Sequence, residues 1–357
     1  MTERIDSRER QLVRRRLRSW YSRRRRDLAW RRTKDPYAVL VSEVMLQQTT
    51  VRVVEPYFLR FMERYPDVRS LARSSEEDVL SIWSGLGYYR RARNLRHAAR
   101  MIEDDHGGSF PTDERSVRQL PGVGRYTAGA VLSIAFDAPL PVLDGNVARV
   151  LSRLFAVPGD PRSAGTSRRL WELAAGLVPQ RGAGDHNQSL MELGALVCLP
   201  ANPRCDECPV ESACRARREG SVGRYPGSSP RPAGVKVLLA SALAVRGGRV
   251  LLEMRRGVRL LDRMWELPTA TVGVAPAAGL ASALAERGLR GIRIGAPVAE
   301  VRHSITHRRL TVTIFEAAAP RVPSRRESPF GWCDPNAEIA LTGLARKSLR
   351  ATGLLEG

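Results

Sequence analysis

The chain has 357 residues and carries 58 Lys and Arg side chains against 37 Asp and Glu, a net charge of +21. This length exceeds one typical compact core, so we expect two domains. No apolar run is long enough for a membrane span and no apolar segment follows the basic N-terminus, so we exclude membrane and secreted classes and expect a cytoplasmic protein. The positive charge favours a polyanionic partner, although a genomic bias toward arginine explains it equally well.

The first 26 residues hold eleven arginines and three acids. Apolar residues recur among them at near-helical spacing, at Leu12, Val13, Leu17, Trp20 and Tyr21. This pattern predicts a basic amphipathic helix. Its charged face fits either exposure to solvent or a position along DNA, and the sequence does not separate the two.

A second helix is predicted to begin at Pro36, with Asp35 as its cap, and to continue through Leu46. Glu43 lies inside this apolar stretch. Apolar surroundings disfavour a charged carboxylate, so the pKa of Glu43 should rise and make it a usable general acid. A glutamate on the solvent-facing side of the helix is the commoner arrangement and is the alternative.

Residues 52–119 show helical patterns throughout, interrupted by a glycine-containing loop at 85–92. The sequence Leu-Pro-Gly-Val-Gly follows at 120–124, and then an apolar run with helical spacing from Tyr126 to Phe136. Two glycines two positions apart permit a tight turn, and the helix behind them directs free N–H groups at one point. We therefore predict a helix-hairpin-helix over about 115–136 that binds a DNA phosphate through Gly122, Val123 and Gly124, in preference to an ordinary turn.

Asp144 stands directly before a glycine, where a turn or cap residue is the simplest interpretation. Four cysteines then fall within seventeen residues, at Cys198, Cys205, Cys208 and Cys214. This clustering predicts a metal site in place of a disulfide framework. Zinc ribbons usually contain two Cys-x2-Cys pairs, and here only Cys205 and Cys208 form one, so zinc is the second choice of metal.

Residues 219–234 are rich in Gly, Ser and Pro and predict an interdomain linker. From Lys236 onward the pattern changes to strands, with a tight hairpin turn at Gly247 and Gly248. The segment 264–268 resembles the entry to a Nudix fold, whose hydrolases need several glutamates on the next helix to hold Mg²⁺. The helix predicted over Ala277–Leu289 offers only Glu286, which indicates Nudix architecture without Nudix catalysis.

The hairpin followed by Leu-Asp-Gly-Asn-Val at 143–147 resembles the helix-hairpin-helix DNA glycosylases, the superfamily of endonuclease III. Residues 42–49, Ser-Glu-Val-Met-Leu-Gln-Gln-Thr, are similar to the signature of the adenine DNA glycosylases of the MutY type. The resemblance implies a multidomain fold of α plus α/β class. Residues 1–218 would form an all-α glycosylase domain with a 4Fe–4S iron–sulfur loop at 198–214, and residues 235–357 would form a Nudix-like α/β domain that recognises 8-oxoguanine.

The resemblance also implies roles for individual residues. Glu43 would be the catalytic acid and Asp144 the second catalytic carboxylate, with Tyr126 and Asn146 arranging the site. The implied substrate-binding residues are Trp30, Arg31, Leu46 and Gln188 in an adenine pocket, Gln48, Thr49, Leu86 and Tyr88 at the duplex, and Thr306 and His307 in an 8-oxoguanine loop. The family's loop is usually Phe-Ser-His, whereas this chain has Ile305 at the first position and loses the aromatic ring.

Tyr126 separates two branches of the superfamily, because bifunctional relatives place a nucleophilic lysine there. No lysine lies between Lys34 and Lys236, so we expect a monofunctional enzyme. It would remove adenine opposite 8-oxoguanine or guanine from double-stranded DNA in base excision repair, as a monomer associated with a bacterial nucleoid. The alternatives are a bifunctional glycosylase/lyase, a lesion-binding protein without activity and a nucleotide hydrolase.

Overall fold

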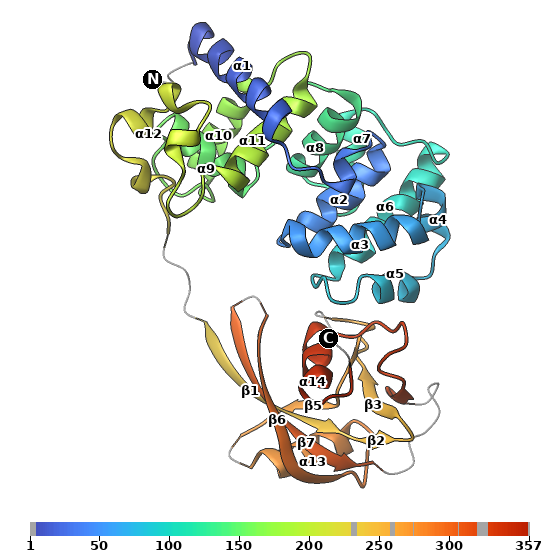
Figure 1. Ribbon diagram of the computed structural model, residues 1–357. Coiled ribbons are helices and arrows are strands. Elements are labelled where there is room, and N and C mark those ends of the chain that lie inside the picture. Colours follow the sequence, from blue (N-terminus) through green and yellow to red (C-terminus); the bar gives the residue numbers. More distant parts are fainter. Residues whose placement is uncertain are drawn as a thin grey trace. The chain divides into compact units, whose positions relative to one another are not determined.

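The computed structural model describes residues 5–229, 234–257, 261–273, 275–305, 307–319 and 328–355. The chain divides into two compact units, one of Met1–Arg73 and His97–Pro230 and the other of Ser74–Arg96 and Arg231–Gly357. The first unit is helical, and the strands lie in the C-terminal part of the second (Figure 1). No helix within the described ranges is long and apolar enough to cross a membrane.

The part of the chain before residue 230 is built from helices joined by short connections. In chain order they are α1 (Ser7–Arg24), η1 (Ala29–Arg31), α2 (Pro36–Leu46), α3 (Val51–Arg64), α4 (Val68–Arg73), α5 (Glu76–Ile82), α6 (Arg90–His106), α7 (Glu114–Gln119), α8 (Arg125–Phe136), α9 (Gly145–Leu154), α10 (Ala164–Leu177), α11 (Ala183–Leu196), η2 (Cys205–Glu207), η3 (Glu211–Ala213), α12 (Arg215–Arg218) and η4 (Val222–Arg224). The last of these, η4, lies within the predicted linker, of which residues 230–233 are outside the described ranges.

Local sequence signals set the start of α2, the helix that carries Glu43. The Asp35 carboxylate accepts hydrogen bonds from the backbone N–H groups of Tyr37 and Ala38, and Pro36 occupies the first helical position. These groups satisfy N–H donors that a helix start otherwise leaves unpaired, so the predicted start of the helix is confirmed.

The predicted helix-hairpin-helix is confirmed as α7, a turn and α8. Gly122 has φ +80°, a left-handed conformation that favours glycine. Gly124 stands at the N-cap of α8 and provides no side-chain cap. The first N–H groups of α8 are therefore not bonded by a cap side chain and can receive an anion.

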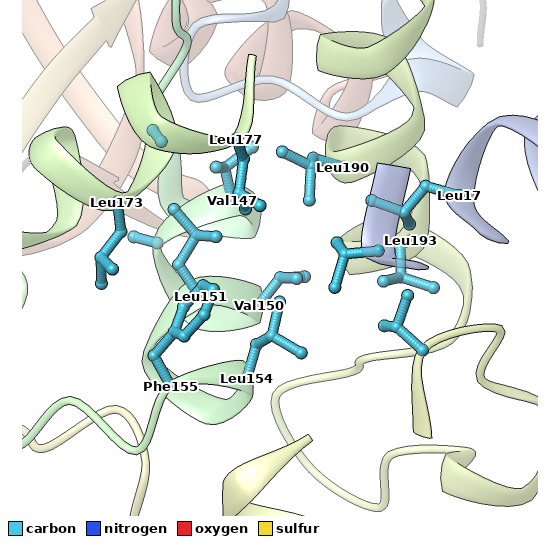
Figure 2. Packing of buried hydrophobic residues seen from close by; sticks show 14 of the residues in the cluster. Leu17, Val147, Val150, Leu151, Leu154, Phe155, Leu173, Leu177, Leu190 and Leu193 are labelled. Atoms are coloured by element: carbon cyan, nitrogen blue, oxygen red, sulfur yellow. The ribbon is translucent and has the colours of Figure 1, made fainter. Parts of the chain in front are cut away.

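The core of the helical unit lies where α1, α8, α9, α10 and α11 meet. Figure 2 shows buried apolar side chains of this cluster packed together, among them Leu17, Val147, Leu151, Leu173 and Leu190. The apolar spacing predicted for the N-terminal basic helix is confirmed, because Leu17 of α1 is fully buried in this core. The packing fixes α9 and α11, which both carry candidate site residues.

Among its described residues, the C-terminal part of the second unit contains two four-stranded sheets and two helices. Its elements are β1 (Val235–Leu243), β2 (Val245–Arg246), β3 (Arg249–Met254), β4 (Trp265–Glu266), β5 (Thr269–Thr271), α13 (Pro276–Glu286), β6 (Arg293–Ile305), β7 (Arg308–Ala318), β8 (Phe330–Cys333) and α14 (Gly343–Ala351). One sheet has the order β5-β1-β7-β6, in which only β1 and β7 are parallel. In the other, β3 pairs with β2, β4 and β8.

Successive side chains of a strand point to opposite faces of its sheet, and the apolar ones contribute to two separate small cores. Val312 and Ile314 of β7 pack with α14, whereas Phe315 packs with α13. The predicted hairpin is confirmed between β2 and β3, where Gly247 and Gly248 have φ +54° and +71°. Helix α13 lies against β1, β5 and β6 of the first sheet, and α14 lies against β6 and β4 (Figure 1).

Candidate active site

A cavity of about 740 Å³ opens in the helical unit between η1, α2, the hairpin, α8 and α11. Its lining gathers most residues that the sequence singled out for chemistry. Those residues are Trp30, Arg31, Glu43, Leu46, Gln48, Thr49, Gly122, Gly124, Tyr126, Asp144, Asn146 and Gln188. Five segments far apart in the sequence therefore meet around one space.

Glu43 is a buried carboxyl group that lines this cavity, with 6% of its surface exposed. Its Oε2 accepts a hydrogen bond of 2.6 Å from the Tyr126 hydroxyl. Burial raises the pKa of Glu43 to about 7, assisted by the charge of Asp144 and opposed by the Tyr126 hydrogen bond and by Arg31. The predicted rise of this pKa is confirmed, and the carboxyl group can hold a proton near neutral pH.

Tyr126 belongs to the first turn of α8. Burial, together with the nearby carboxylates of Glu43 and Asp144, raises the pKa of its phenol well above the ordinary value. The phenol therefore stays protonated and donates. Its hydroxyl oxygen also lies 3.3 Å from the sulfur of Met191, which lines the same cavity.

Asp144 is at once a helix cap and a cavity residue. It precedes α9, and its Oδ1 accepts a hydrogen bond of 2.7 Å from Val147 N. Its Oδ2 accepts one of 3.0 Å from the Asn146 amide. Burial raises the pKa of Asp144, and these hydrogen bonds act in the opposite direction. The cap fixes the carboxylate at the cavity wall.

Hydrogen bonds run from Asp144 along α9 to the cysteine segment. Arg149 donates to Asn146 Oδ1 at 2.9 Å and to the carbonyl oxygen of Cys198 at 2.7 Å. One turn further on, Arg153 lies 3.4 Å from Cys198 Sγ and donates to the carbonyl of Leu199 at 2.6 Å. The position of Asp144 is thereby linked to the segment that carries the four cysteines.

The four cysteines line one small cavity of their own, together with Arg153 and Arg217. Burial raises the pKa of the Cys208 thiol to about 12 and also raises the pKa of Cys205 and Cys214. In the part of the chain that is described, no three His, Cys, Asp or Glu side chains form a group that could hold one metal ion. The four thiols share one cavity.

A buried charge cluster forms the wall of the active-site cavity beside η1. Glu192 of α11 accepts hydrogen bonds from the guanidinium groups of both Arg26 and Arg31 at 2.6 to 3.0 Å. The two paired arginines lower the pKa of Glu192 to about 2 although burial opposes this. No local sequence feature indicates Arg26, Met191, Arg149 or this glutamate, because their partners are distant in the chain.

The other predicted site residues lie elsewhere. Val123, a residue of the hairpin itself, is 7% exposed and does not line the cavity. Leu86 and Tyr88 belong to the second compact unit, where Leu86 is buried and Tyr88 is 49% exposed. His307 lies in the connection between β6 and β7, and Thr306 is outside the described residues.

The helix-hairpin-helix, the acid that follows it (Asp144) and the buried acid Glu43 all contribute to one cavity. This combination defines the helix-hairpin-helix class of base excision DNA repair proteins. Residues 41–175 match the model of the HhH-GPD superfamily base excision DNA repair proteins, and residues 240–350 match the NUDIX domain. The adenine DNA glycosylase of Mus musculus is 37% identical over 370 residues, covering 88% of this chain and 72% of that protein. The chain belongs to the adenine DNA glycosylase family.

A second relative agrees with this assignment, and a solved structure agrees with the fold of the helical part. The adenine DNA glycosylase of Rattus norvegicus is 50% identical over 227 residues, which are 60% of this chain and 44% of the rat protein. This chain thus spans less than half of that relative's length. A solved structure of a thermostable thymine-DNA glycosylase superposes with a TM-score of 0.54 at 29% identity, covering 59% of this chain and 98% of the other.

Proposed function

We propose that this chain is a monofunctional adenine DNA glycosylase that removes adenine paired with 8-oxoguanine or guanine in double-stranded DNA. The observation that carries the proposal is the pairing of two carboxyl groups in one cavity. Glu43 is buried and has a pKa of about 7, while Asp144 is fixed by the start of α9. One acid that holds a proton and one carboxylate that stays charged are what the cleavage of a glycosidic bond requires.

Duplex DNA would be held by its phosphates at the hairpin. The N–H groups at the start of α8 and its positive dipole end suit a phosphate oxygen. The target adenine would leave the stack and enter the cavity of about 740 Å³. Trp30 gives the cavity an aromatic wall, and the Gln188 amide can both donate to and accept from the edge of adenine.

Protonation of the base would start the reaction. Glu43 transfers its proton to N7 of adenine, which turns the base into a better leaving group. The bond between C1′ and N9 breaks, its electron pair leaves with the base, and positive charge develops on the sugar. The Asp144 carboxylate stabilises that charge. A water molecule adds to C1′ and returns a proton to Glu43, so that free adenine and an abasic site are the products.

Strand cleavage would not follow, because a β-lyase step needs an amine nucleophile on the sugar. Tyr126 occupies the place where bifunctional relatives have lysine, and its phenol donates to Glu43. The helical unit has one lysine in its sequence, Lys34. Lys34 is absent from the cavity lining.

We propose that the four cysteines hold a 4Fe–4S cluster. The four thiols line one cavity, and four cysteine thiolates are the ligands that a 4Fe–4S cluster takes. Cys198, Cys205, Cys208 and Cys214 would hold the cluster as thiolates and would thereby be cross-linked through it. Arg149 and Arg153 tie that segment to α9.

The C-terminal domain would read the base opposite adenine. Hydrolysis of a nucleotide by this domain is disfavoured, because α13 contains one acid, Glu286, where a Mg²⁺ site needs several. Ile305 is the last residue of β6, and His307 lies in the connection from β6 to β7. We propose that this connection contacts 8-oxoguanine, without the aromatic ring that the family's pattern has at position 305.

The function is tested by Glu43→Gln, which keeps the shape of the side chain and removes the transferable proton. We expect no adenine release from an adenine·8-oxoguanine duplex and unchanged affinity for that duplex. The matched control is Glu172→Gln, which changes an exposed residue of α10 by the same chemistry and should retain full activity. Adenine release by Glu43→Gln at the normal rate would overturn the assignment of the acid.

A further inference from the structure

Glu192 is the most buried ionised group of the helical unit that the reaction above does not use. Its side chain is 0% exposed, and its partners Arg31 and Arg26 are 12% and 33% exposed. Leu190 and Leu193, which flank it on α11, are anchored in the apolar core (Figure 2). The carboxylate is therefore held by a rigid helix at the wall of the active-site cavity.

Both arginines are fixed by more than one contact. Arg31 donates to the two carboxylate oxygens of Glu192 at 2.9 and 2.8 Å and to the Arg26 carbonyl at 3.2 Å. Its guanidinium carbon also lies 5.7 Å from the centre of the Tyr21 ring. Arg26 donates to Glu192 through its backbone N–H and its guanidinium group. Neither guanidinium group is left to turn toward another carboxylate.

The cluster lies beside the proton donor of the reaction. Glu43, Arg26, Arg31 and Glu192 line the same cavity. The charged and titratable groups that act on Glu43 are Tyr126 from α8, Asp144 from the start of α9 and Arg31 from η1. Arg31 is the one that favours the ionised form of Glu43 by its charge alone. Two arginines and one glutamate give the cluster a net charge of +1, and without Glu192 that charge would be +2.

We propose that Glu192 is a positioning residue that keeps Glu43 protonated at neutral pH, by pairing with Arg26 and Arg31, offsetting part of their charge and holding both in a fixed geometry. This inference rests on the proposed adenine glycosylase activity. It predicts that the charge of the cluster, and not only its packing, sets the pH at which the enzyme loses activity.

The test is the pH dependence of single-turnover adenine release from an adenine·8-oxoguanine duplex by the full-length protein. The rate should fall as the pH rises through the pKa of Glu43. In Glu192→Gln the net charge of the cluster rises from +1 to +2, because one negative charge is removed. The falling limb of the pH–rate profile, where activity is lost as the pH rises, should therefore move to lower pH by about half a unit or more. At a pH above the limb this shift lowers the rate about threefold.

Charge-compensating variants separate this role from a structural one. Arg26→Gln lowers the cluster charge to zero and should move the limb to higher pH. The double variant Glu192→Gln with Arg26→Gln restores the charge of +1 and should return the limb to the position in the unmodified protein. If Glu192→Gln alone does not fold, because it leaves two guanidinium groups with too few acceptors, Arg26→Gln and the double variant still carry the test.

The control is again Glu172→Gln, which changes the net charge of the whole protein by the same amount at an exposed site. The falling limb of the pH–rate profile of Glu172→Gln should stay where it is in the unmodified protein. A limb that stays in place in Glu192→Gln and Arg26→Gln, whatever the change in maximal rate, would overturn the inference and leave the proposed function intact. Absence of adenine release from the unmodified protein would overturn the proposed function and this inference with it.

Discussion

The Tyr126 hydroxyl donates a hydrogen bond of 2.6 Å to Glu43 Oε2, and this contact joins α8 to α2 inside the cavity. The hairpin directly precedes Tyr126, so the element that would grip the DNA backbone also orients the acid. The bond leaves Glu43 Oε1 as the oxygen that can carry a proton to a base. A contact between residues 83 positions apart thus connects DNA binding to proton transfer.

Replacement of Tyr126 by phenylalanine tests the value of this bond. The bond favours ionised Glu43, so its loss should raise the pKa of Glu43 and move the falling limb of the pH profile to higher pH. The maximal rate should fall about tenfold because the carboxyl group loses its orientation. Single-turnover rates across the pH range measure both effects. A profile identical to that of the unmodified protein would contradict this role.

The unmodified protein should show a bell-shaped pH dependence. Activity should fall as the pH rises through the pKa of Glu43, near 7, because the acid is then ionised. It should also fall as the pH drops through the pKa of Asp144, which burial raises, because that carboxylate then becomes neutral. The two acids lie in one cavity, so the measured values belong to the pair. A rate that stays constant well above neutral pH would exclude Glu43 as the proton donor.

Gly194→Ala should disturb the link between the active site and the cysteine segment. A Cβ at position 194 would lie 2.6 Å from Asn146 Cβ and 3.0 Å from Asn146 Cα, so α11 or α9 must move. We expect a loss of about 1–3 kcal/mol in the free energy of unfolding and a slower adenine release, since Asn146 orients Asp144. Gly165→Ala on α10, where a Cβ meets no atom within 4 Å, is the matched control and should not destabilise the protein. Equal stability of the two variants would refute the close approach of α11 to Asn146 at Gly194.

Purified protein should be yellow-brown and contain iron and inorganic sulfide. Cys208→Ser should lose this colour, because the replacement removes one of the four thiols that share the cavity. Metal analysis of the two proteins measures the effect. A colourless protein with one zinc ion per chain would show that the four cysteines hold a different metal.

The sequence predicts the features that depend on neighbours along the chain. Asp35 and Pro36 mark the start of α2, and the two glycines of the hairpin permit the turn before α8. The apolar residues around Glu43 indicate its burial. For Asp144 the local pattern indicates only a cap, and the structure adds that the capping carboxylate faces the cavity.

Contacts between distant segments leave no such signal. Glu192 and Arg26 are 166 positions apart, and Arg149 and Cys198 are 49 apart. In a chain with 58 basic residues, nothing in the local sequence distinguishes an arginine that pairs with a buried acid from one on the surface. The partners become evident only when α1, α9 and α11 are packed around their common core (Figure 2).

The central claim is tested most directly by single-turnover cleavage of an end-labelled duplex that contains adenine opposite 8-oxoguanine, analysed with and without alkali. Duplexes with a matched adenine·thymine pair and with thymine glycol are the controls. We predict strand breaks only in the mismatched duplex and only after alkali, because the enzyme removes the base and leaves the sugar–phosphate chain intact. Breaks without alkali, or breaks at thymine glycol alone, would contradict a monofunctional adenine glycosylase and the roles given to Tyr126 and Gln188.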